Sequence, residues 1–232
     1  MKYIRKGKEP NYLTQYRNKV CNSWVDKAQK IRMTPKQGYE ASDMPKAQLL
    51  ETLIEEQGSI CCYCMRRISK SSKHLPHIEH YLPQSSHPKL ALDYKNLLAV
   101  CQGEYSDKSG NKDWHCDHRK ANGLLRFLNP LNENCEQVLQ YTNEGRIKSD
   151  RADVKQDIDL LNLNSDALKK ERKKAIEATL NAIGRRFKGS TVTKLFIKDR
   201  IEKFASRNED GYFEPYCQAI IFILQKMLSR AK

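Results

Sequence analysis

Histidine and cysteine residues are concentrated in one stretch of this chain, from Cys61 to Asn122, and this clustering constrains the fold more than any other feature. All six histidines of the 232-residue sequence lie in the stretch, as do five of the eight cysteines. The histidines are His74, His77, His80, His87, His115 and His118. Because imidazole and thiol groups bind metal ions and transfer protons, we interpret the stretch as a metal-dependent site around which the chain folds.

A Cys61-x-x-Cys64 pair opens this stretch. The spacing lets a tight turn present two thiolates to one tetrahedral zinc ion, and Cys101 and Cys116 are the nearest residues that could complete the set. Four thiolates with no open position predict a structural Zn²⁺ site. The alternative is that zinc is absent and Cys101 is an ordinary buried thiol. Cys62 is expected to stand outside the site. The isolated cysteines are interpreted as structural: Cys21, Cys135 and Cys217.

Glu79 and His80, adjacent in the segment HIEHYLPQS, carry groups that phosphodiester hydrolysis needs. A histidine with a near-neutral pKa can take a proton from water, and a neighbouring carboxylate can hold Mg²⁺ or Mn²⁺. Downstream, the amide of Asn96 could orient the histidine. Either Asp117 or His118 could complete the site of the catalytic ion.

The formal net charge of +14 favours a polyanionic partner, with nucleic acid first. The basic excess lies mainly outside the central stretch, as expected for a site that also holds cations. The simpler alternative is that the charge only keeps the protein in solution. No run of about 18 apolar residues predicts a membrane span, and the N-terminus lacks the apolar region of a secretory signal. We therefore expect a cytoplasmic protein with no membrane partner.

The order of these motifs resembles that of HNH endonucleases. It consists of CxxC, EHxxPxS, NL with a following Cys, and a last Cys with a Lys soon after. That family builds its site from a hairpin and a helix, the ββα-metal motif, often braced by zinc. By position, the resemblance implies that His80 is the general base and Glu79 a ligand of the catalytic ion. Asn96 takes the place of the asparagine that supports the loop carrying the histidine.

Two features depart from the family pattern. The third position is Asp117 where the family has His or Asn, and His118 follows directly as a competitor. Aspartate is a good Mg²⁺ ligand, so this departure preserves the function. Lys120, one residue further on than usual, is expected near the phosphate. The other departure is a long insertion between Cys101 and Cys116.

Neighbouring residues carry further expectations. His77 shares a strand face with Glu79 and either supports it or simply packs. His115 either contacts the substrate or replaces Cys116 at the zinc. Arg119 is expected to contact nucleic acid.

Segments outside the motifs resemble PtuB-type HNH proteins, which are effector nucleases of bacterial Septu anti-phage systems and of some retrons. These segments are KYIRKGKEP, HCDHRKAN, NPLNENCEQVLQYTNEGRI and LLNLNSDALKKER. The resemblance implies a nuclease held inactive in complex with a PtuA-type ATPase, and DNA is the substrate class we expect. One alternative is a structured RNA such as tRNA as substrate. Another is a zinc-stabilised nucleic-acid-binding module without catalysis.

The expected fold class is α+β and mostly helical. It comprises an N-terminal helical support (1–60), a ββα-metal nuclease core with structural zinc (61–128), and a hairpin plus a C-terminal helical region (129–232). Apolar periodicity predicts helices over 11–30, after Pro45, over 154–163, 165–187 and 192–205, and after Pro215. Thr34-Pro35 is an expected break. Short strands are expected over 77–82 and in hairpins around the CxxC turn and around Asn143-Glu144-Gly145.

Overall fold

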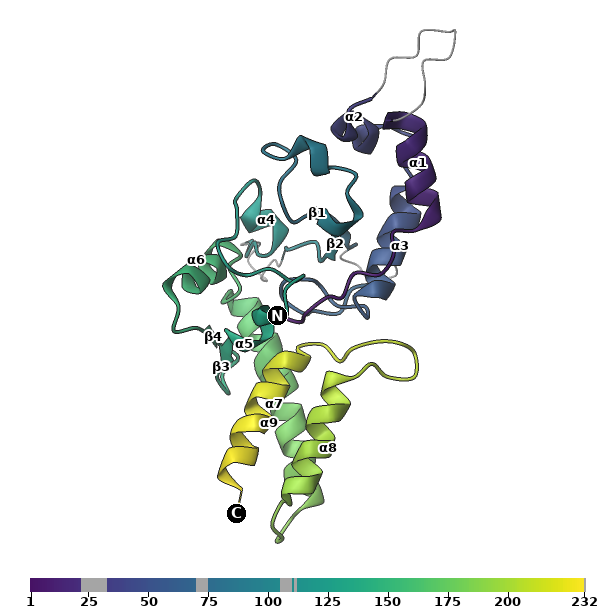
Figure 1. The fold of residues 1–232 in the computed structure, drawn as a ribbon. Coiled ribbons are helices and arrows are strands. Elements are labelled where there is room, and N and C mark those ends of the chain that lie inside the picture. The colour runs from purple at the N-terminus through teal and green to yellow at the C-terminus, as the bar shows by residue number, and fades with distance from the viewer. Residues whose placement is uncertain (22–32, 70–74, 105–109, 111, 232) are drawn as a thin grey trace, which may run out of the picture.

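The computed structural model describes residues 1–21, 33–69, 75–104, 110 and 112–231. Within these ranges the N-terminal helices lie at one end of an elongated molecule and the C-terminal helices at the other (Figure 1). Two small two-stranded sheets lie between them. One apolar core cluster draws buried residues from all three predicted segments. Because the three segments share this core, the structure does not separate them, and their boundaries stay a prediction.

Three helices form the N-terminal end: α1 (Asn11–Cys21), α2 (Pro35–Glu40) and α3 (Lys46–Glu56). The helix α1 agrees with the first half of the helix predicted over 11–30, and residues 22–30 lie outside the described residues. The expected break at Thr34-Pro35 falls at the start of α2, a short helix that was not predicted. Thr34 and Gln37 form a reciprocal capping box, and Pro35 occupies the first turn, where no amide donor is needed.

The helix α3 connects the N-terminal end to the centre. It buries Leu49, Leu53 and Ile54, as its periodicity predicts, and it ends at the expected position. Its C-cap residue, Gln57, is a buried amide that donates to the carbonyl oxygens of Ile60 (2.9 Å) and Ala99 (2.8 Å). It also accepts from the amide of Ala99 at 2.7 Å. One side chain thus joins the helix, the CxxC turn and the central sheet.

The central sheet consists of β1 (His77–His80) and β2 (Leu97–Val100). The strands are antiparallel, with His77 opposite Val100 and His80 opposite Leu97. Two short 3₁₀ helices lie between them, η1 (Pro88–Leu90) and η2 (Tyr94–Asn96), and the one-turn helix α4 (Asp117–Lys120) follows. The hairpin predicted around the CxxC turn is present as an antiparallel bridge between Ile60 and Arg67.

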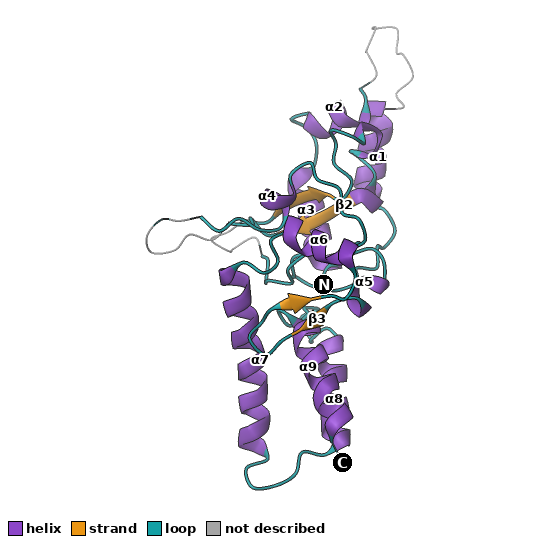
Figure 2. Cartoon of the chain, turned by 90° about the vertical axis from the view of Figure 1, so that its left-hand side faces the viewer, coloured by secondary structure: helices purple, strands orange, loops and turns teal. Residues whose placement is uncertain are grey.

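The C-terminal part contains a second small sheet and four longer helices. Its elements are α5 (Asn134–Gln137), β3 (Gln140–Tyr141), β4 (Ile147–Lys148), α6 (Ala152–Leu160), α7 (Asp166–Arg186), α8 (Lys194–Ala205) and α9 (Cys217–Arg230). The predicted hairpin and helices are confirmed here. Ser165 caps α7 by accepting a hydrogen bond from the amide of Leu168. The helices α8 and α9 pack together, whereas α7 stands apart from α8 along most of its length (Figure 2).

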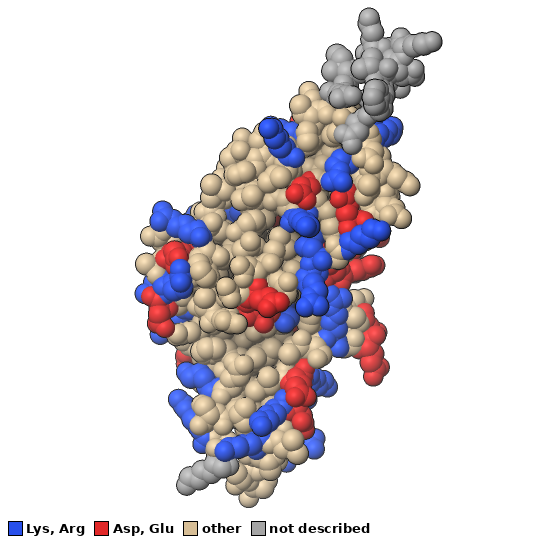
Figure 3. Space-filling model, viewed as in Figure 1, with Lys and Arg blue, Asp and Glu red and all other residues tan. Residues whose placement is uncertain are grey.

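The mixed, mainly helical fold class is confirmed by these elements. None of the helices in the described ranges combines the length and apolarity that a membrane span requires. Basic and acidic side chains are interspersed over the face shown in Figure 3, and basic ones gather toward its lower end, near the C-terminus.

Candidate functional site

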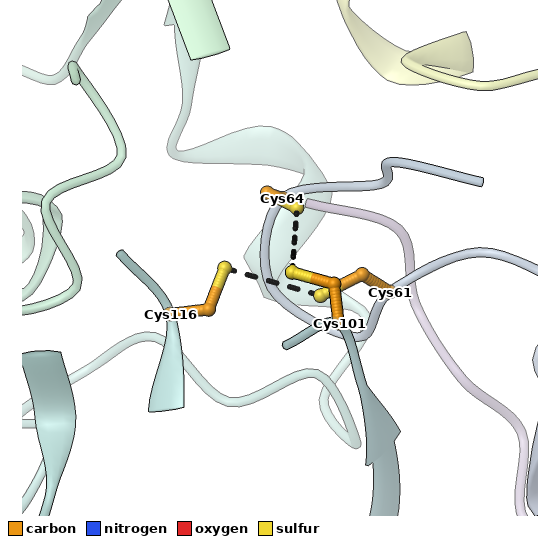
Figure 4. A group of neighbouring side chains, drawn as sticks. All are labelled: Cys61, Cys64, Cys101 and Cys116. Carbon is orange, nitrogen blue, oxygen red and sulfur yellow. Dashed lines mark hydrogen bonds between the residues drawn. The ribbon is translucent and has the colours of Figure 1, made fainter. Parts of the chain in front are cut away.

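Four cysteines form a buried cluster: Cys61, Cys64, Cys101 and Cys116. Their sulphur atoms all lie within 4.8 Å of one another and point toward a common centre (Figure 4). The Cys61–Cys116 and Cys64–Cys101 sulphur separations are 3.9 and 3.7 Å. A tetrahedral zinc ion with bonds of about 2.3 Å would hold its sulphur ligands roughly 3.8 Å apart. The donor set and its size therefore fit Zn²⁺.

The local backbone explains how three separate segments supply these thiols. Cys61 and Cys64 lie in a tight turn, in which the amide of Cys61 donates to the carbonyl oxygen of Arg66 at 2.9 Å and Met65 has a φ of 63°. Cys101 directly follows β2, and Cys116 directly precedes α4. The cluster therefore joins the CxxC turn, the central sheet and α4.

The two ends of the insertion after Cys101 meet at Gly103. The amide of His115 donates to the carbonyl oxygen of Gly103 at 2.8 Å. Gly103 has a φ of 69°, and a Cβ atom there would lie 2.3 Å from the carbonyl oxygen of His115. Glycine is required at this position, because both the left-handed backbone and the close approach exclude a side chain. The returning chain is thereby placed where Cys116 joins the cluster.

His115 is fully buried beside this cluster, with its Nδ1 atom 3.2 Å from the sulphur of Cys116. Burial lowers its pKa to about 4, so the imidazole is neutral near pH 7. Its Nε2 atom has no hydrogen-bond partner among the described residues. This buried position beside the sulphur differs from the expected contact with nucleic acid, and the four-thiol set is complete without the imidazole.

A second cluster, which we call the carboxylate cluster, lies between β1 and α4. Glu79 is only 4% exposed, and its Oε1 atom accepts hydrogen bonds from the hydroxyl of Tyr63 and the ammonium of Lys120, both at 2.7 Å. The Glu79 carboxyl group is also hydrogen-bonded to Asp117. Asp117 in turn pairs with the Nε2 atom of His77 at 2.7 Å.

The pKa values of the two carboxyl groups in the carboxylate cluster are shifted in opposite directions. Burial, together with the negative charge of Asp117, raises the pKa of Glu79 to about 8. Burial opposes ionisation of Asp117 too, but hydrogen bonds from His77 and Glu79 outweigh it and lower its pKa to about 2. Near pH 7 these shifts favour the protonated form of Glu79 and the ionised form of Asp117.

The side chain of His80 leaves β1 on the face opposite that of Glu79. Its imidazole ring is held in one tautomer. Its Nε2 atom lies 3.0 Å from the carbonyl oxygen of Ala91, which can only accept, so Nε2 carries the hydrogen. The Nδ1 atom then has a free electron pair, and the amide nitrogen of Gln84 lies 3.1 Å from Nδ1 and 3.2 Å from Nε2. The ring of Tyr39 meets the imidazole edge-on at 4.5 Å, and burial lowers the pKa of His80.

Asn96 ties together the two ends of the loop that carries Gln84. Its amide nitrogen donates to the carbonyl oxygens of Leu82 (3.0 Å) and Leu90 (3.3 Å). Its carbonyl oxygen accepts from the amide of Leu82 at 2.8 Å. Since Ala91 follows this loop directly, Asn96 also fixes the carbonyl group that orients His80.

The residues of α4 have separate surroundings. Asp117 contacts Glu79, whereas the exposed ring of His118 stacks on Trp114 with 4.4 Å between ring centroids. Arg119 is exposed, as a nucleic-acid contact would need. Lys120 is only 2% exposed, and besides Glu79 its ammonium reaches the carbonyl oxygen of His80 at 3.1 Å. This buried position differs from the expected place near a phosphate.

Three contacts were not anticipated from the sequence: Tyr63 on Glu79, Gln84 on His80 and Tyr39 against the imidazole. Tyr63 lies inside the CxxC turn and Gln84 inside the EHxxPxS segment, so their position within the motifs was the available signal. Tyr39 lies on α2, a helix that was not predicted, and nothing in the sequence connected it with His80.

Two similar proteins bear on the class of protein to which this geometry belongs. No family model matches the chain. The sequence is 26% identical over 181 residues to a protein of Vibrio cholerae serotype O1 biovar El Tor described as "Retron Vc95 putative HNH endonuclease". That similarity covers 74% of this chain and 85% of the relative. It is also 34% identical over 61 residues to "Septu protein PtuB" of Bacillus thuringiensis, covering 26% of this chain and 23% of that relative.

The class that these findings support is an HNH-type nuclease. Within that class, both relatives are of the anti-phage type, one from a retron and one from a Septu system. The chain spans less than a quarter of the PtuB relative, so the retron protein is the one that it resembles over most of its length.

Proposed function

We propose that this chain is a divalent-metal-dependent HNH endonuclease that hydrolyses phosphodiester bonds, with β1, β2 and α4 as its ββα-metal core. The observation that carries this proposal is the arrangement at β1. His80, whose ring is held by the carbonyl oxygen of Ala91, directly follows Glu79, whose buried carboxyl group pairs with Lys120 and lies near Asp117. A module that only binds nucleic acid needs neither group, so this arrangement favours catalysis over binding alone.

The carboxylate cluster suits a hard divalent cation such as Mg²⁺ or Mn²⁺. Glu79 and Asp117 present oxygen atoms within hydrogen-bonding distance of each other, and oxygen donors are what such ions prefer. When bound, the ion would stabilise charge on a non-bridging phosphate oxygen and on the leaving 3′ oxygen. Glu79 must lose its proton before it can bind a cation well.

His80 supplies the base in this mechanism. Its Nδ1 atom takes the proton of the attacking water, while the carbonyl oxygen of Ala91 holds the ring through Nε2–H. The amide of Gln84 lies against both ring nitrogens, so it borders the space that the attacking water would occupy. Asn96 keeps the loop and the Ala91 carbonyl in place while this happens.

The four cysteines would hold the structural Zn²⁺ and act as a brace. Tyr63 lies between the two metal-binding residues Cys61 and Cys64 in sequence and donates to Glu79. The zinc site therefore positions a hydrogen-bond donor to the carboxylate cluster without taking part in the reaction.

For the biological setting, we propose an effector nuclease of a bacterial anti-phage system that acts with a PtuA-type ATPase. Similarity to a Septu PtuB and a retron nuclease supports this setting. DNA is the proposed substrate, since the net charge of +14 suits a nucleic acid. A structured RNA such as tRNA would be equally attracted by this charge and is the alternative substrate.

The deciding experiment compares cleavage of duplex DNA and of total RNA by the wild type and by His80→Ala, in Mg²⁺ and in Mn²⁺, with and without EDTA. We expect cleavage that EDTA stops and that His80→Ala lowers by at least about 100-fold, since general-base catalysis contributes on the order of 10²–10⁴. The matched control is His87→Ala, a histidine of the same loop region bonded to Ser86, which should cut normally.

Normal cleavage by His80→Ala would show that the base is assigned wrongly. If the wild type cuts neither polymer, alone or with a PtuA-type ATPase, the protein is better explained as a zinc-stabilised binding module. Cleavage of RNA with no cleavage of DNA would mean that the same site acts on the alternative substrate, RNA.

A further inference from the structure

An open groove lies between α7 and α8, beside the residues that follow the CxxC turn. Its volume is about 610 Å³. One wall is formed by small side chains of α7, including Ala175, Ala178 and Ala182, and the other by α8, including Phe204. Ile220 of α9 lies at its base. In the side view, α8 lies beside α9 and α7 is separated from α8 (Figure 2).

The lining of this groove is mainly apolar and is left uncovered by the described chain. Ala178 and Ala182 are exposed although they lie in the middle of a long helix. From Ala175 to Ala182 the wall extends about 10 Å, which is two helical turns at about 1.5 Å per residue. Small side chains over this length allow another backbone to approach closely, and an α-helix about 10 Å wide matches the scale of the opening.

The rim of the groove carries positive charge that the described residues do not neutralise. Lys174 and Lys203 are exposed at its edges. Arg200 also lines it, and the Nε atom of Arg200 is buried with no hydrogen-bond partner among the described residues. A buried donor left without an acceptor costs about 1–3 kcal/mol, so an incoming acceptor would be favoured here.

The acidic residues of the lining do not offset this charge. Glu171 accepts two hydrogen bonds from the guanidinium of Arg66, at 3.0 and 2.9 Å, and a third from Tyr216. Glu214 lies near Arg67, whose own hydrogen bonds go to backbone carbonyl oxygens. The groove therefore combines an apolar floor with a basic rim.

We propose that this groove is a docking site for an acidic amphipathic helix of another protein, one whose apolar stripe is bordered by Asp and Glu. The apolar floor favours a protein helix over a nucleic-acid backbone, which would place phosphates against Phe204 and the alanines. A second copy of this chain is disfavoured because like charges would meet, given the basic rim and the net charge of +14.

This inference goes beyond the proposed catalysis. The residues that carry it belong to α7, α8 and α9, whereas Glu79, His80 and Asp117 lie on β1 and α4. A helix seated in the groove would contact the surface where Arg66 and Glu171 connect the CxxC turn to α7. The surface can thus be tested by binding alone, with cleavage measured separately.

The test uses two fluorescein-labelled model helices of about 18 residues with the same Leu and Ala stripe, one flanked by Glu and the other by Lys. Fluorescence anisotropy should show that the intact protein binds the Glu peptide and not the Lys peptide. Ala178→Trp, which fills the groove, should abolish binding. The double variant Lys174→Glu/Lys203→Glu should weaken the Glu peptide by at least about tenfold and gain affinity for the Lys peptide.

Controls separate this site from general charge and from catalysis. Lys155→Glu, an exposed charge on α6, should leave peptide binding unchanged, and His80→Ala should bind like the wild type. All groove variants should keep the far-ultraviolet circular dichroism and the cleavage activity of the wild type. Equal binding of both peptides, no binding, or binding unaffected by Ala178→Trp would overturn the proposal. Displacement of the Glu peptide by a short DNA duplex, lost in the same variants, would overturn it in favour of nucleic acid.

Discussion

Cys64 and Cys62 lie two residues apart in one buried turn, yet only Cys64 belongs to the four-thiol cluster. Replacing each by alanine therefore removes one buried sulphur atom in both variants but a zinc ligand in only one. We expect Cys64→Ala to lose the metal and much of its stability, while Cys62→Ala keeps one zinc ion per chain.

The size of the effect follows from the geometry of the cluster. Its sulphur separations of 3.7 and 3.9 Å match those of a tetrahedral zinc site. We therefore expect zinc binding to contribute the full free energy of a structural site. Such sites contribute about 10–16 kcal/mol, as much as the net stability of about 5–15 kcal/mol of a whole domain. Loss of only about 5 kcal/mol would lower Tm by at least about 10 °C for a chain of this length.

The control variant has a smaller expected cost. Cys62→Ala removes one buried atom and no ligand, which costs about 1 kcal/mol and lowers Tm by about 2–4 °C. Zinc content is measured by inductively coupled plasma mass spectrometry and Tm by circular dichroism, on protein purified without chelator. Prolonged treatment of the wild type with a strong chelator should reproduce the thermal behaviour of Cys64→Ala.

Two outcomes would refute this reasoning. If Cys64→Ala retains one equivalent of zinc, the cluster is not the metal site. If the wild type carries no zinc even after growth and purification with added Zn²⁺, the four cysteines are buried thiols. A large loss of stability in both variants with unchanged zinc would mean that packing in the turn, and no metal, holds this region together.

Three further predictions concern the carboxylate cluster and the parts that hold it. Asn96→Ala should lower the free energy of unfolding by about 1–3 kcal/mol and reduce cleavage without loss of zinc, measured by urea denaturation and activity assays. Gly103→Ala should lower the free energy of unfolding by at least about 1 kcal/mol, because its left-handed φ and the 2.3 Å approach to His115 exclude a Cβ atom. Unchanged stability would show that Gly103 and His115 do not approach each other in this way. Because the pKa of Glu79 is about 8, binding of Mn²⁺ should release a proton, and its affinity should increase as pH rises from about 6.5 to 8. Titration calorimetry in two buffers measures both effects. An affinity independent of pH would mean that Glu79 is not a ligand.

The helices and short strands were largely predictable because their signals are local. The apolar spacing of Leu49, Leu53 and Ile54 is enough to define α3, and Ser165 is enough to begin α7. The error at α2 has an equally local cause. A proline after a threonine was interpreted as a break, whereas Gln37 three residues later completes a capping box.

The grouping of the four cysteines was predictable because a metal site restricts residue type, number and burial together. The internal pairing of the carboxylate cluster was not. Whether Lys120 reaches a phosphate or Glu79 depends on how α4 lies against β1, and no spacing in the sequence encodes that angle. The same holds for Tyr39, which reaches His80 only because α2 packs near η1.

The choice between Asp117 and His118 illustrates the limit most clearly. Both side chains are chemically suited to a divalent ion, and they are adjacent in the chain. On a helix, neighbouring residues project about 100° apart, so only the orientation of α4 decides which one faces β1. In the structure Asp117 contacts Glu79, and His118 turns toward Trp114.

The hydrogen bond between Gly103 and His115 closes the insertion that follows Cys101. Asp113 and Trp114, just before His115, are also held by the side-chain amide of Asn162, so the described ends of the insertion are fixed independently of its length. Doubling the length of such a closed loop costs only about 0.6 kcal/mol. Related proteins could therefore lengthen, shorten or exchange this segment while keeping the metal site, and an engineer could insert a reporter peptide there.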